Sequence, residues 1–126
     1  MKSHYIIFVL LSFCSVAFGQ SNRIELGKEY AENELKIALS GEKQHNYIDL
    51  KRVIIKDSLT ATTIAESILF DIYGKSNIIE QRPYEIYHIN NYWILIGTLP
   101  EGMRGGTFLI IIDDRNSQVI KIAHGR

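Results

Sequence analysis

Residues 84–96 read YEIYHINNYWILI, and this stretch decides the fold. Two runs rich in β-branched and aromatic residues flank Asn90-Asn91, and asparagine tolerates the positive φ that a two-residue hairpin turn requires. Such a turn fixes the register, so that residue 89 pairs with 92, 88 with 93, 87 with 94 and 86 with 95. The stretch therefore predicts an antiparallel β-hairpin.

The extended pattern continues on both sides of this hairpin. Pro83, the loop at 100–106 and a polar stretch at 114–117 separate the apolar runs from one another. The predicted strands cover residues 78–81, 84–89, 92–99, 107–113 and 118–124. Consecutive strands joined by short turns are typical of an antiparallel meander.

Both faces of the predicted sheet are apolar. His88 and Trp93 share one face of the hairpin, whereas Tyr87 and Ile94 share the other. A half-solvated antiparallel sheet alternates apolar and polar residues, so we expect both faces to be covered. Either the helices and segment 42–56 cover them, or part of one face is a docking surface for a partner.

Two helices precede the strands. Asn22 and Glu25 have the spacing of a capping box, which predicts a first helix from about residue 23 to 39, ending at Ser40-Gly41. Capping residues at 57–60 and Gly74 bound a second helix. Its predicted apolar stripe comprises Ala61, Ile64, Ala65, Ile68 and Ile72. Helices followed by consecutive strands indicate an α+β fold, with two N-terminal helices packed on the meander sheet.

The N-terminus has the layout of a secretory signal peptide. Lys2 precedes an apolar run, and small residues occupy the positions before a predicted cleavage site between Gly19 and Gln20. The apolar stretch at 5–18 is shorter than the roughly 20 residues that span a bilayer. We expect a signal peptide at 1–19 and one exported domain at 20–126, periplasmic or secreted and without a membrane span. A membrane anchor or a lipid on Cys14 is the alternative.

The composition excludes several function classes. The 126 residues include 14 basic and 14 acidic residues, and this balance gives no reason to bind nucleic acid. Cleavage would remove Cys14, the single cysteine, and with it any thiol chemistry. The sequence lacks the common hydrolase, zinc-protease and nucleotide-binding motifs. We therefore expect no catalytic residue, no metal and no cofactor.

An ordered series of motifs runs through the half from Asp57 to Arg126. The series comprises Tyr73-Gly74, Arg82-Pro83-Tyr84, Trp93, Gly97-Thr98-Leu99-Pro100, Gly105-Gly106 with Phe108, and His124-Gly125. It resembles the immunity proteins of bacterial polymorphic toxin systems that have a nuclear-transport-factor-2-like fold. The resemblance implies a helix packed into a strongly curved, cystatin-like sheet. It also implies a non-enzymatic protein that binds and neutralises a cognate toxin, which an exported chain would meet in the periplasm.

The candidate partner-binding residues are aromatic anchors and charged rim residues. Tyr84 and Trp93 share the predicted hairpin face, and large aromatics are common interface anchors. They are also common core residues, and for Trp93 we favour the core over a partner contact. The charged candidates are Arg82, Glu101, Arg104 and Arg126. The oligomeric state is left open. Two other functions remain: a small-ligand-binding protein or enzyme with a cavity between helix and sheet, and a protease-inhibitor-like module of the envelope.

Overall fold

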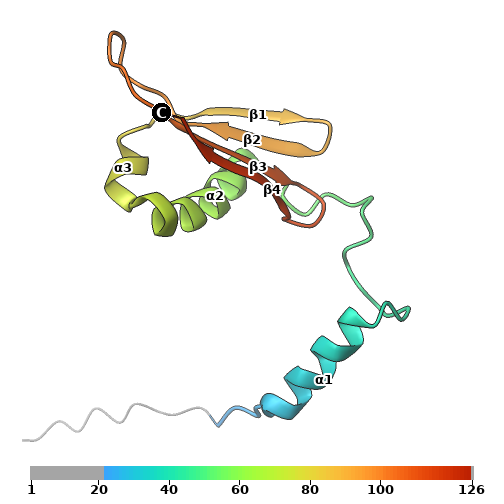
Figure 1. Cartoon of the computed structure of the whole chain (residues 1–126). Coiled ribbons are helices and arrows are strands. Elements are labelled where there is room, and N and C mark those ends of the chain that lie inside the picture. Colours follow the sequence, from blue (N-terminus) through green and yellow to red (C-terminus); the bar gives the residue numbers. More distant parts are fainter. Residues whose placement is uncertain (1–21, 126) are drawn as a thin grey trace, which may run out of the picture. The chain divides into compact units, whose positions relative to one another are not determined.

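The computed structural model describes residues 22–125 (Figure 1). The predicted signal peptide, its cleavage site between Gly19 and Gln20, and the candidate Arg126 lie outside the described residues. The chain divides into two units, residues 1–44 and 45–126, and each is described by itself. The prediction of one domain over 20–126 stays a prediction. Among the described residues, no helix is long and apolar enough to cross a membrane.

The first unit contains helix α1, Gly27–Leu39. The predicted start near residue 23 is wrong, because Gly27 has a φ of 83°, which breaks the right-handed path and leaves the capping box outside the helix. The predicted end is confirmed: Ser40 follows the last turn and Gly41 has a φ of 74°. No residue of α1 is buried, and its role as a cover for the sheet stays a prediction.

The second unit begins with an extended segment and helix α2, Ser58–Tyr73. The Asp57 carboxylate caps α2 by accepting the backbone N–H of Thr60 at 2.8 Å, and Gly74 ends the helix with a φ of 87°. Both ends are as predicted. The buried residues of α2 are Ala61, Ala65 and Leu69. The predicted stripe is wrong at Ile72, which is 52% exposed, because the line that meets the sheet passes through Leu69 instead.

A short helix, α3 (Lys75–Ile79), follows α2 directly. The predicted strand at 78–81 is therefore wrong. The positive φ of Gly74 turns the chain into a new helical turn, and this turn buries Ile78 completely in the core. The β-propensity of Ile78 and Ile79 is local and weak, so the burial of Ile78 overrides it.

Four strands form one antiparallel sheet in the order β1-β2-β3-β4. Their bounds are Glu85–Ile89, Tyr92–Ile96, Phe108–Asp113 and Val119–His124. The meander and the hairpin register are confirmed, with Ile89 opposite Tyr92 and Ile86 opposite Leu95. Asn90 and Asn91 have φ values of 47° and 67°, as the two-residue turn requires.

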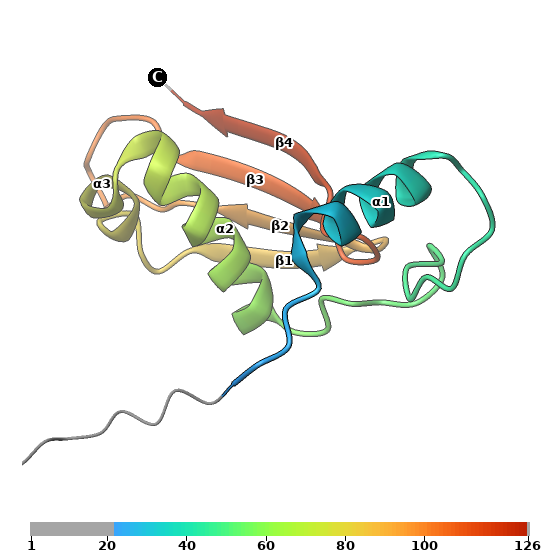
Figure 2. The same cartoon turned by 90° about the horizontal axis from the view of Figure 1, so that it is seen from below.

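Helix α2 lies across one face of this sheet (Figure 2). The core between them contains Leu69 from α2 together with Trp93, Leu95, Phe108, Ile110 and Ile112 from the strands. On the opposite face, Tyr87 and Ile89 are exposed. The extended segment adds Ile55 to the core, since the Trp93 indole donates to the Ile55 carbonyl at 2.9 Å. The second unit is thus an α+β domain with one helix on a four-stranded sheet.

Candidate functional site

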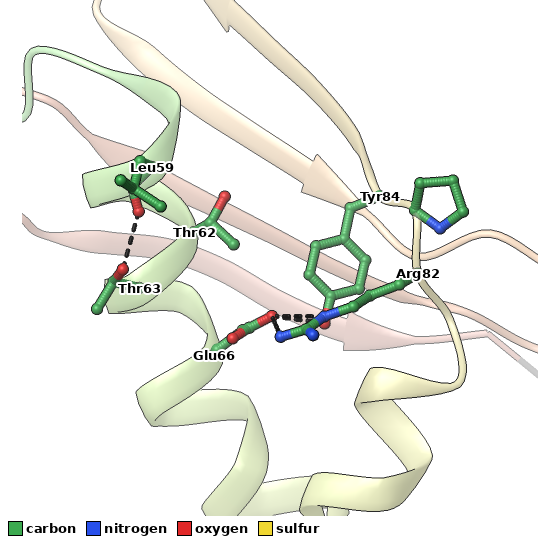
Figure 3. A pocket seen from close by; sticks show the side chains of 7 residues that line it. Leu59, Thr62, Thr63, Glu66, Arg82 and Tyr84 are labelled. Carbon is green, nitrogen blue, oxygen red and sulfur yellow. Dashed lines mark hydrogen bonds and ion pairs between the residues drawn. The ribbon is translucent and has the colours of Figure 1, made fainter.

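A groove of about 510 Å³ lies between α2 and the segment that enters β1 (Figure 3). Leu59, Thr62, Thr63 and Glu66 of α2 form one wall, and residues 82–84 form the other. The α2 residues share one helix face because they are spaced by three and four positions. The groove therefore lies beside the buried line of α2 and opens to solvent.

Glu66, Arg82 and Tyr84 form a hydrogen-bonded group in this groove (Figure 3). Glu66 Oε1 accepts from Arg82 Nε at 3.1 Å, from Arg82 Nη2 at 2.6 Å and from the Tyr84 hydroxyl at 2.9 Å. The hydrogen bonds to Glu66 raise the pKa of Arg82, and burial raises the pKa of Tyr84. At neutral pH Arg82 is therefore a charged guanidinium and Tyr84 a neutral phenol.

The exposed residues of the groove include a cation and a large apolar side chain. Arg82 has 50% of its side chain exposed, whereas its partner Glu66 has only 15%. Within residues 22–125, the hydrogen bonds of Arg82 use Nε and Nη2 and leave Nη1 without a partner. Leu59 at the rim is 76% exposed. A partner would therefore meet an exposed leucine beside an oriented guanidinium, and this combination suits a protein interface.

The loop between β2 and β3 adjoins the groove at its base. The Thr98 hydroxyl donates to the Pro83 carbonyl at 2.7 Å, and the Thr98 backbone N–H donates to the Gln81 carbonyl at 2.9 Å. Beyond this base, the loop projects past the ends of the strands (Figure 1). Glu101 and Arg104 are exposed near the tip, where Met103 is 63% exposed. The groove and the loop that carries Glu101 and Arg104 thus meet where Thr98 contacts Gln81 and Pro83, and together they form the candidate surface.

Trp93 does not belong to this surface. It is only 8% exposed, and its indole N–H is bonded to the Ile55 carbonyl. The prediction of Trp93 as a partner contact is therefore wrong, and its alternative as a core residue is confirmed. The reason is that α2 and the segment ahead of it cover the hairpin face that carries Trp93.

Gln81 is a key residue that the sequence analysis missed. It is 3% exposed, its Oε1 accepts the Phe108 N–H at 2.8 Å, and its Nε2 donates to the Asn77 carbonyl at 3.1 Å. A Cβ on Gly97 would collide with the Gln81 side chain, so glycine is required there. Nothing in the local sequence distinguishes Gln81, because Gly97 and Phe108, which require its position, are remote along the chain.

Two further glycines of the motif series are also structural. A Cβ on Gly106 would collide with the backbone carbonyl of Gly125, a group that cannot move aside as a side chain could. Gly125 in turn donates its N–H to the Thr107 carbonyl at 2.9 Å. These glycines allow the chain to pass close to itself where β3 begins and β4 ends.

Asp113 and Asp114 do not converge on one site. Asp113 pairs with Arg115, whose hydrogen bonds hold the pKa of this carboxyl below its ordinary value. Asp114 is fully buried and contacts His88 Nε2 through its Oδ2 at 2.6 Å. Within the described part of the chain, no three histidine, cysteine or acidic residues are grouped so that they could hold a metal ion.

Residues 60–126, which include most of α2, the sheet and all of the candidate surface except Leu59, match the NTF2 fold immunity protein family. The chain belongs to this family. The NTF2 fold agrees with the α+β architecture of the second unit, and membership supports an immunity function and a toxin as partner in general. Helix α1 and the extended segment precede the matched residues.

Two similar proteins of Escherichia coli strain K12 carry no described function. This immunity protein is 28% identical to the uncharacterized protein YhhH over 95 residues, which are 75% of this chain and 73% of YhhH. It is 30% identical to the uncharacterized protein YbbC over 73 residues, which are 57% of this chain and 60% of YbbC. No solved structure matches the chain.

Proposed function

We propose that this immunity protein binds and neutralises one cognate toxin through the groove and the adjoining loop. We call this the groove–loop surface, comprising Leu59, Glu66, Arg82, Tyr84, Glu101 and Arg104. The observation that carries the proposal is the exposed Leu59 beside an arginine that is half exposed yet held by Glu66. Family membership supports the toxin as the class of partner.

The arrangement of Arg82 favours tight binding. Its guanidinium is held by two hydrogen bonds to Glu66. A side chain that is already ordered loses less conformational entropy when a partner binds. An acidic group of the toxin would meet the open Nη1 edge, while an apolar toxin side chain would cover Leu59 and the Tyr84 ring. Buried arginine and aromatic contacts of this kind dominate many interfaces.

Neutralisation by this surface needs no chemistry from the immunity protein. A bound protein that covers the active site or the target-binding surface of a toxin prevents its action for as long as the complex lasts. The signal-peptide layout of residues 1–19 favours an encounter in the periplasm or outside the cell. A toxin that acts on the cell envelope therefore fits the proposal better than a cytoplasmic nuclease.

A co-expression experiment tests the proposed function. A toxin that the full chain retains from envelope extracts of its source is produced in a sensitive host with and without the full chain, and survival is measured. We expect survival only with the immunity protein, together with a one-to-one complex of the two purified proteins. A folded immunity protein that neither binds the toxin nor restores growth would contradict the proposal.

A further inference from the structure

Gln81 connects four segments of the second unit. Its backbone carbonyl accepts the Thr98 N–H at the start of the β2–β3 loop, and its side-chain Oε1 accepts the Phe108 N–H at the end of that loop. Its Nε2 lies 3.1 Å from the Asn77 carbonyl of α3 and 3.3 Å from His124 Nε2 of β4. One buried residue therefore holds both ends of the loop that carries Glu101 and Arg104, the start through its backbone carbonyl and the end through its side chain.

The hydrogen bonds fix the orientation of the Gln81 amide. Its oxygen must face the Phe108 N–H, because an amide nitrogen only donates. Its nitrogen therefore faces His124 Nε2, which must accept. A histidine nitrogen accepts only in the neutral ring, so the proton of His124 is on Nδ1. This tautomer agrees with the 3.0 Å contact between Nδ1 and the Gly125 carbonyl.

We propose that Gln81 and His124 form a proton-sensitive latch on the loop at residues 98–107. A protonated His124 has two donors and cannot accept from the Gln81 amide. The amide cannot rotate in response without losing the Phe108 N–H. Acid therefore opens the contact, because two N–H donors would then face each other across it.

The surroundings of His124 contain little that could compensate for a charge. The titratable group packed against it is Tyr73 of α2, whose ring centre lies 5.0 Å from that of His124. Among residues 22–125, no ion pair or hydrogen bond joins His124 to a charged side chain. His88 differs in kind, since its Nε2 faces a carboxylate oxygen of Asp114, which accepts, rather than an amide N–H, which donates.

Amide hydrogen exchange on the full chain alone tests the latch. Protection of the Thr98 and Phe108 amides is compared at pH 7.5 and pH 5.5, after correction for intrinsic exchange rates. Histidine normally changes charge in this range. We expect protection to fall at the lower pH by roughly two- to tenfold, the range for loss of one hydrogen bond.

Two variants make the test specific. His124→Gln can accept from Gln81 through its side-chain oxygen but does not titrate, so the pH response should disappear. Gln81→Glu adds an acceptor that can face the protonated ring, so the response should reverse and the loop should be more protected at pH 5.5. His88→Gln is the matched control and should keep the wild-type response. Unchanged protection in the wild type, or a response that survives in His124→Gln, would overturn the proposal.

The consequence for toxin binding rests on the proposed function. If the loop contacts the toxin, affinity should be lower at pH 5.5 than at pH 7.5, and His124→Gln should remove the difference. A loop that opens in acid while affinity stays constant would support the latch and contradict the role of the loop in toxin binding. The two claims can therefore fail separately.

Discussion

Gln81 and Arg82 are adjacent in the sequence, but Gln81 points into the core and Arg82 lies at the surface. Gln81 is buried and bonded to three other segments through its side chain, whereas Arg82 is half exposed and bonded to one carboxylate. Around Gln81 lie Gly97 and His124 of the motif series, and around Arg82 lie Leu59 and the groove. Gly97 and His124 of the motif series therefore help to build the fold, whereas Arg82 and Tyr84 of the same series belong to the surface proposed for the toxin.

A substitution at the close backbone contact between Gly106 and Gly125 should abolish the fold. In Gly106→Val the new side chain meets the Gly125 carbonyl, so we expect no cooperatively folded protein. Circular dichroism during heating checks this. Leu99→Ala changes an exposed residue of the same loop and should unfold like the wild type. A cooperative transition of wild-type midpoint in Gly106→Val would show that the backbone contact is dispensable.

A substitution in the groove that Arg82 lines should remove protection against the toxin and keep the fold. Leu59→Asp places a charge at the groove rim, where Leu59 is 76% exposed, so we expect loss of protection against the toxin at nearly unchanged melting temperature. Ile72→Asp alters an exposed residue of the same helix outside the groove and should still protect. Equal protection by both variants would exclude the groove as the binding site.

Substitution of the core aromatic Trp93 should lower stability rather than impair toxin binding alone. Trp93→Phe removes the donor to the Ile55 carbonyl and leaves a buried acceptor without its partner, which costs about 1–3 kcal/mol of the free energy of unfolding. Urea denaturation measures this cost. Tyr87→Phe, on an exposed residue of the same hairpin, should change stability by less than about 0.5 kcal/mol. If Trp93→Phe impaired toxin binding without loss of stability, Trp93 would be a toxin contact and not a core residue.

The smallest effect concerns the Asp113–Arg115 ion pair, which belongs neither to the contacts of Gln81 nor to the groove. Arg115 lowers the folded pKa of Asp113, so the pair stabilises the protein above the ordinary carboxyl pKa near 4. This contribution disappears as the pH falls through the lowered folded value. The stability difference between wild type and Asp113→Asn should therefore shrink between pH 5 and pH 2 in urea titrations. A difference that is constant over this range would contradict the ion pair.

The sequence predicts features whose causes are local. The Asn90-Asn91 turn determined the hairpin register, and Asp57 and Gly74 determined both ends of α2. Remote contacts decided the rest: burial of Ile78 made a helix of a β-prone segment. Arg82 and Tyr84 could be named from the motif series, but their shared partner Glu66, 16 residues before Arg82, could not.

The most direct test of the account is the affinity of the purified toxin for two arginine variants, measured by titration calorimetry. Arg82→Ala removes the groove arginine, and Arg52→Ala removes an exposed arginine that is likewise paired, with Asp49. We expect Arg82→Ala to weaken binding by more than about tenfold at unchanged melting temperature, while Arg52→Ala binds like the wild type. Wild-type affinity of Arg82→Ala would contradict the groove–loop surface as the toxin-binding site.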